Sequence, residues 1–208
     1  ILKHMPLHFH MILITRSDPP LELEWLRLAG QLLEFRMEDL RFSTQEAGVF
    51  LKQVIGRHLT ERDINDLNKR TEGWIAGLQL AAISLRGRQD LSAAIQSFTG
   101  SQRFVFDYLL EQVLNRQPAP LRHFLLKTSV LDKLSAPLCD EVAETGGASH
   151  ELLEALESTN LFLNALDDER RWYRYHPLFA DLLKLVLEQT YPRLSISPGT
   201  VGWRLWKT

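Results

Sequence analysis

The sequence lacks several features that define large classes of proteins. It contains one cysteine, Cys139, among 208 residues, which excludes an internal disulfide framework and a multi-cysteine zinc site and fits a reducing cytoplasm. No apolar run reaches the roughly 18 residues of a membrane span. Neither sign of charge dominates, because 24 Lys and Arg stand against 26 Asp and Glu. We therefore predict a cytoplasmic chain that binds neither a membrane nor, through this segment, nucleic acid.

Signature motifs of enzymes are missing as well. There is no G-x-x-x-x-G-K-[ST] loop and not even a Gly-Lys dipeptide, so the chain has no lysine-bearing loop to cradle a phosphate. It has no G-x-S-x-G, G-x-G-x-x-G or H-E-x-x-H motif, which removes the anchor residues of hydrolases, dinucleotide-binding enzymes and zincins. The seven histidines are dispersed without metal-ligand spacing. The sequence thus predicts no catalytic residue and no metal site.

From residue 41 onward the helical period dominates. Ser43 with Glu46, and Thr60 with Asp63, have the spacing of capping boxes and predict two helix starts. Apolar residues recur at helical spacing through most of the rest, and prolines near residue 118 indicate a boundary. Besides the helix that opens at Thr60, we expect helices at residues 43–55, 72–86, 91–98, 104–116, 121–131, 137–144, 151–158 and 178–189.

Near residue 160 the period changes to two. The segment LFLNAL (161–166), the turn DDER (167–170) and the segment RWYRYH (171–176) predict a β-hairpin. Three helices followed by a two-stranded wing are typical of the winged helix, a variant of the helix-turn-helix scaffold.

The first 40 residues have a different pattern. The apolar run MILIT (11–15) ends in Arg16 and is stopped by two prolines, as in a buried strand that delivers a charged residue to a sheet edge. A short helix in LELEWLRLAG (21–30) and a second apolar run, QLLEFRM (31–37), follow. This order predicts an α/β segment. From the residues alone, Arg16 fits an ion pair at a sheet edge as well as a ligand contact.

Three separated stretches, taken in order, point to one family. The three stretches are LITRSDPPLELEWLRLAGQLLEFRMEDLRFSTQEAGVFL, RTEGWIAGLQLAAISLRGR and RYHPLFADLL. They occur together with GSQRFVFDYLLEQVL and FLLKTSVLDKLSAPLCDEV. Over about residues 1–190 the chain resembles the ATP-binding signalling core of large LuxR-type transcriptional activators of the maltose-regulator kind. These belong to the STAND class of signal-transducing NTPases.

The resemblance implies a mostly α fold with three parts. They are the C-terminal part of an α/β P-loop nucleotide-binding domain (1–40), a helical lid (41–117) and a winged helix (118–190). An irregular tail (191–208) departs from the family pattern and has no assigned function. Because the chain begins with Ile, we expect a fragment whose P-loop lies before it and whose sensor and DNA-binding domains lie after it.

The function implied is an ATP/ADP-dependent regulatory switch in a bacterial transcriptional activator. The parent protein would be a slow signalling ATPase that self-associates, while the fragment itself would not be catalytically competent. Mg would be held by residues outside this chain. DNA would be bound only through a C-terminal domain that is missing here.

The resemblance also assigns a nucleotide-binding role to five residues. Arg16 matches a sensor arginine that contacts the γ-phosphate through its forked guanidinium. Gly73, Trp74 and Ile75 match a lid motif that packs against the adenine, with Ile75 where related NTPases have proline. His176 matches a winged-helix histidine that reaches the β-phosphate of ADP. From the residues alone, Trp74 fits a core position equally well, and a lone histidine such as His176 is more often an ordinary packing residue.

Two other functions remain open at this point. A winged helix that binds DNA directly would need a basic recognition helix, but residues 151–160 contain three glutamates and no Lys or Arg. A scaffold for protein partners is compatible with everything except the coincidence of three nucleotide-site motifs.

Overall fold

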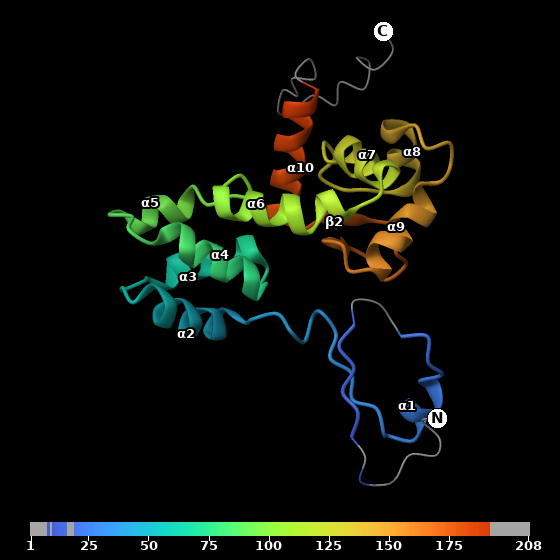
Figure 1. Cartoon of the computed structure of the whole chain (residues 1–208), viewed down its shortest axis with the longest axis horizontal. Coiled ribbons are helices and arrows are strands. Elements are labelled where there is room, and N and C mark those ends of the chain that lie inside the picture. Colours follow the sequence, from blue (N-terminus) through green and yellow to red (C-terminus); the bar gives the residue numbers. More distant parts are fainter. Residues whose placement is uncertain (1–7, 9, 16–18, 192–208) are drawn as a thin grey trace.

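The computed structural model describes residues 8, 10–15 and 19–191. Within these residues the chain is mostly α-helical, as predicted, and its one sheet is a two-stranded hairpin (Figure 1). No helix in these residues is long and apolar enough to cross a bilayer. The elements are α1 (Glu24–Leu28), α2 (Thr44–Ile55), α3 (Glu61–Thr71), α4 (Ile75–Leu85), α5 (Leu91–Gln96), α6 (Arg103–Gln112), η2 (Leu114–Arg116), α7 (Ala119–Thr128), α8 (Ala136–Ala143), α9 (Ser149–Ser158), β1 (Leu163–Ala165), β2 (Tyr173–Tyr175) and α10 (Pro177–Thr190).

Both predicted capping boxes are present at the starts of α2 and α3. Ser43 accepts from the Glu46 amide at 3.3 Å, while the Glu46 carboxylate accepts from the Ser43 amide at 2.9 Å. Thr60 and Asp63 repeat this reciprocal pair at the start of α3. Such pairs satisfy backbone donors that a helix start leaves free. Because they are local, their spacing in the sequence was enough to predict them.

Most predicted helices differ from the structure by one to three residues at an end, and two of them are interrupted by a change of backbone conformation. The helix expected from residue 72 begins at Ile75, because residues 72 and 73 both have positive φ, at 50° and 72°. The helix expected over 104–116 ends at Gln112 and continues as the short 3₁₀ segment η2. In each case a local change of backbone conformation interrupts an apolar pattern that continues at helical spacing.

The hairpin and its surrounding helices have the winged-helix order. Helices α7, α8 and α9 precede the wing, which we define as β1, β2 and their turn. Leu163 lies opposite Tyr175 and Ala165 opposite Tyr173, so the predicted hairpin is confirmed. Backbone hydrogen bonds between Leu134 and Tyr173 fasten β2 to the loop between α7 and α8.

The strand expected at residues 10–15 is absent. These residues are not in a sheet, since the one sheet that the structure describes consists of β1 and β2. The side chains of Ile12 and Ile14 are 87% and 97% exposed. An apolar run becomes a strand only when a neighbouring strand takes up its backbone N–H and C=O groups. Arg16, like the tail from residue 192, lies outside the described residues.

One continuous apolar core links helices α2 to α6 with the winged helix. We call α2 to α6 the lid helices, after the expectation from the sequence. The core runs from Ala47 and Leu51 in α2, through Leu109 in α6, to Leu182 and Leu187 in α10. Helix α10 contacts α3, α6 and α7. Figure 1 shows α10 between the lid helices and the α7–α8 pair, with the segment before residue 41 to one side. The junction between lid and winged helix is therefore a packed interface.

Candidate functional site

The candidate site is built around the turn between α3 and α4. Residues 72 and 73 both adopt the left-handed conformation, so the chain reverses within two residues. The Gly73 amide donates to the Asn68 carbonyl at 3.2 Å, and the Trp74 amide donates to the Thr71 carbonyl at 2.8 Å. These bonds satisfy carbonyls at the C-terminus of α3. The turn thus fixes Trp74 at the start of α4.

Gly73 lies close to the backbone of Phe42. The Phe42 amide donates to the Gly73 carbonyl at 2.9 Å. A Cβ at position 73 would lie 2.5 Å from the Phe42 carbonyl oxygen, in addition to the strain of a φ of 72°. Only glycine fits between the turn and the linker, which we define as residues 37–42.

His176 reaches the same turn from the winged helix. It is the N-cap residue of α10, and its Nδ1 accepts from the Leu178 amide at 3.3 Å. Nε2 lies 2.9 Å from the Thr71 carbonyl oxygen. Because Nδ1 accepts, Nε2 carries the proton and donates to Thr71. Both ring nitrogens therefore have partners within the protein.

The environment of His176 favours the neutral imidazole. The side chain is buried, and this desolvation lowers its pKa below the usual value, although the Thr71 carbonyl and the Glu72 carboxylate oppose the shift. Arg41 and Arg174 lower the pKa further. At neutral pH the ring is a hydrogen-bond donor without a charge of its own.

Three rings meet beside this turn. Trp74 contacts His176 edge to face at a centroid distance of 6.0 Å, and Phe162 lies 5.1 Å from Trp74 and 5.7 Å from His176. Edge-to-face contacts of this kind are favourable for aromatic pairs. Ile75, the next residue, is 38% exposed. Trp74 is thus part of the packing between lid and winged helix, and Ile75 remains open to solvent.

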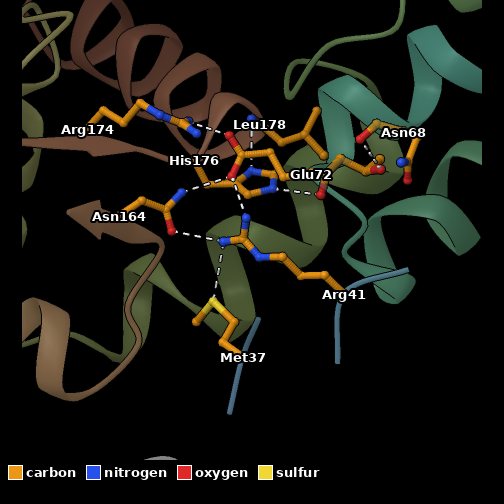
Figure 2. A network of polar contacts seen from close by, with 9 residues as sticks. Met37, Arg41, Asn68, Glu72, Asn164, Arg174, His176 and Leu178 are labelled. Carbon is orange, nitrogen blue, oxygen red and sulfur yellow. Dashed lines mark hydrogen bonds and ion pairs between the residues drawn. The ribbon is translucent and has the colours of Figure 1, made fainter. Parts of the chain in front are cut away.

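Glu72 collects polar contacts from three other segments, which Figure 2 shows. Arg41 lies in the linker, Asn164 in β1 and Arg174 in β2, and each contacts the Glu72 carboxylate. We call these four residues the Glu72 cluster. The sequence reasoning missed it. The available signal was a glutamate at a helix C-terminus, where a negative charge opposes the helix dipole and needs cationic partners.

The structure brings together four of the five predicted site residues. Gly73, Trp74 and Ile75 are consecutive, and His176 joins them from about a hundred residues away through its bond to Thr71. The position of Arg16 relative to them is outside the described residues. A cavity of about 320 Å³ lies between α6, α7 and α10, and its walls include Leu110, Arg122 and Val186. None of these four site residues is part of its lining.

Comparison with known families agrees with the observed order of elements from α6 to α10. Residues 110–195 match the MalT winged helix domain. This range includes η2, the three helices α7 to α9, the wing and α10. His176 therefore lies within the matched range, where the wing meets α10.

Two relatives extend the similarity beyond the MalT-type winged helix. The HTH-type transcriptional regulator MalT of Yersinia pestis is 36% identical over 188 residues, which is 88% of this chain and 20% of the relative. The serine/threonine-protein kinase PknK of Mycobacterium tuberculosis is 35% identical over 183 residues, or 88% of this chain and 16% of the relative. The chain thus spans a fifth or less of the length of these relatives.

Proposed function

We propose that this chain is the lid and winged-helix segment of a nucleotide-dependent switch in a transcriptional regulator. The observation that carries the proposal is the meeting of Gly73, Trp74 and His176 at one turn. Gly73 and Trp74 were assigned to nucleotide binding from one sequence motif, and His176 from a second motif in the winged helix. Two unrelated motifs have no reason to converge, whereas parts of one ligand site must.

The two relatives support a regulatory role over direct DNA binding. One is named a transcriptional regulator and the other a protein kinase, yet each is similar over 88% of this chain. A segment that occurs with different output activities suits a control element. Helix α9 also presents Glu151, Glu154 and Glu157, and these would repel DNA phosphates.

The hydrogen bonds of His176 suggest how a nucleotide would act. Its one N–H donates to the Thr71 carbonyl, so a phosphate oxygen would have to compete with that carbonyl for the same proton. In the proposed switch, this competition couples phosphate binding to the contact between α3 and the start of α10. A neutral imidazole makes this exchange inexpensive, because no buried charge has to be created first.

Other parts of the nucleotide site are assigned to the parent protein. We propose that ATP or ADP is gripped mainly by a phosphate-binding loop on the domain that residues 1–40 complete, and that Mg is held there as well. The exposed side chains of Ile12, Ile14, Leu33 and Phe35 support this assignment, because apolar runs of this kind are normally covered by a sheet or a helix. Self-association and DNA binding would likewise belong to the intact regulator.

The test is nucleotide binding by the intact protein that carries this segment. His176→Ala should weaken ADP binding by at least about tenfold, the usual effect of losing a hydrogen bond to a charged group. Arg16→Ala should weaken ATP selectively, because a guanidinium at the γ-phosphate distinguishes the two nucleotides. Calorimetric titration with each nucleotide measures both effects.

The matched control is His150→Ala, since His150 is an exposed histidine of the same winged helix that pairs with Glu154. It should leave both affinities unchanged. Equal affinities for the wild type and for the Arg16 and His176 variants would refute the proposed site.

A further inference from the structure

The carboxylate of Glu72 is shared by side chains that arrive from opposite sides. From the linker, Arg41 Nη1 lies 3.4 Å from Glu72 Oε2. From the wing, Asn164 Nδ2 donates to the same oxygen at 2.9 Å, and Arg174 Nη1 donates to Oε1. Figure 2 shows the carboxylate between these groups. One acidic side chain therefore joins the lid, the linker and the wing.

Arg41 also bridges the lid and the wing directly. Its Nη2 donates to Asn164 Oδ1 at 3.0 Å, while its Nη1 faces Glu72. The next residue, Phe42, is bonded to Gly73 through its amide, and Met37 Sδ lies 3.7 Å from the same guanidinium. Any displacement of the linker must therefore break contacts to the turn and to β1 together.

Burial and charge make these contacts costly in free energy to break. The Glu72 side chain is 11% exposed, in contrast to 31% for Arg41 and 36% for Arg174. Within the cluster two guanidinium groups depend on one carboxylate. Removing one partner of a largely buried ion pair leaves an uncompensated charge, which is much more costly than loss of an exposed pair. The cluster is consequently stable only when linker, lid and wing are all in place.

We propose that the Glu72 cluster is a conformational latch that makes docking of the wing on the lid depend on the position of the linker. The linker leads back to residues 1–36, so the latch would report the position of that segment to the winged helix. The turn that carries Glu72 also carries the Thr71 carbonyl that holds His176. Opening the latch would thus loosen the contact that holds His176. The biological use of the latch rests on the proposed switch, but its existence is testable without nucleotide.

Glu144 is a control for Glu72 that matches it in charge and backbone conformation, although its side chain is 66% exposed. Glu144 is also a helix C-cap residue with left-handed φ, at 55° against 50° for Glu72. It also pairs with a largely buried cation, Lys127 Nζ, at 3.0 Å. Both partners of that pair lie within the winged helix. Glu144→Gln therefore removes the same charge from the same backbone conformation without touching the lid.

The experiment measures the linker and the wing separately in this chain. The hydrogen-exchange rate of the Phe42 amide reports whether the linker is attached to the turn, because that amide donates to the Gly73 carbonyl. Double electron-electron resonance measures the distance between spin labels at Lys52→Cys in α2 and Asp168→Cys in the wing turn, and this distance reports the docking of the wing. Both positions are exposed and can be labelled. The native Cys139 is buried, and burial raises the pKa of its thiol to about 12, so it resists labelling.

Glu72→Gln should speed Phe42 exchange by about tenfold or more and broaden the distance distribution between the labels, because charge-assisted bonds are lost on both sides. The decisive result is the cross-effect of the two arginines. Arg41→Gln should broaden the lid-to-wing distances, and Arg174→Gln should speed exchange at Phe42. Glu144→Gln should change neither measurement.

The latch is refuted if each arginine variant affects only its own side, or if Glu144→Gln has the same effects as Glu72→Gln. Should Glu72→Gln fail to fold, the two arginine variants carry the test by themselves. Nucleotide titration of the intact protein is a separate measurement, so a failure of the proposed switch and a failure of the latch give different results.

Discussion

His176 shows how the role of a single residue depends on its surroundings. Its place in the sequence, between a strand and a proline that starts a helix, predicted an imidazole at a strand-to-helix junction. The structure places it there, as the N-cap of α10, and adds a bond to Thr71 that no local pattern indicates. Whether a phosphate takes over that bond stays a prediction.

Burial of His176 should make the stability of this chain depend on pH. Its folded pKa is lowered, so on acidification the unfolded state takes up a proton first, below about pH 6.5. The free energy of unfolding should therefore fall as the pH drops from about 7 through that value, and this loss should level off below the folded pKa. Urea denaturation at several pH values measures it.

His176→Asn is the reference for that experiment, because asparagine retains a side-chain acceptor at the N-cap and does not titrate. Protonation of carboxylates with lowered pKa values, such as Asp140 and Asp167, reduces the unfolding free energy of both proteins at lower pH. This contribution cancels in the difference between them. Parallel stability curves for the wild type and the variant would contradict the assignment.

At the scale of elements, the turn between α3 and α4 has a backbone conformation and contacts that the sequence pattern did not predict. Helical spacing of apolar residues predicted a helix over residues 72–86, and α4 occupies residues 75–85 of it. The pattern did not indicate two successive left-handed residues before the helix. Gly73 permits that conformation, and Glu72 adopts it in spite of its Cβ. The contacts of Arg41, Asn164 and Arg174 with Glu72 come from distant segments, which a local pattern does not contain.

Gly73→Ala should be more destabilising than Gly87→Ala. Both glycines have nearly equal left-handed φ, 72° and 75°, so the conformational strain of an alanine is shared. At position 87 the new Cβ meets nothing within 4 Å, whereas at position 73 it meets the Phe42 backbone. We expect about 1–2 kcal/mol for Gly87→Ala and about 1–3 kcal/mol more for Gly73→Ala.

Urea denaturation of the two variants gives this difference directly. Far-ultraviolet circular dichroism should show that both remain helical before denaturant is added. Equal losses of unfolding free energy would mean that the linker moves away from Gly73 at little cost.

At the scale of the whole molecule, the described residues fall into a packed part and an exposed part. From residue 41 to residue 191, buried side chains form one core through the lid and the winged helix. Before Arg41, Leu23 is the one buried side chain among the described residues, and Leu28, Leu33 and Phe35 are exposed. Stability and exposed apolar surface therefore reside in different parts of the chain.

A shortened chain that begins at Arg41 should retain the fold. Because the deleted part buries so little, its unfolding free energy should stay within about 1 kcal/mol of the full chain. It should also associate less at high concentration, since exposed apolar side chains promote aggregation. Denaturation and light scattering test both statements, and a loss above about 3 kcal/mol would show that the N-terminal segment packs on the core.

The helical class, both capping boxes, the hairpin and the winged-helix order could be predicted from local sequence patterns. These features depend on interactions between residues close in the chain, such as Ser43 with Glu46, and on apolar periodicity. The bond from His176 to Thr71 and the contacts by which Glu72 joins the linker to the wing are visible only in the folded chain. Those contacts join residues far apart in the chain, and burial gives them their strength. The apolar run at residues 11–15 shows the converse, because a strand pattern forms no strand without a neighbour to pair with.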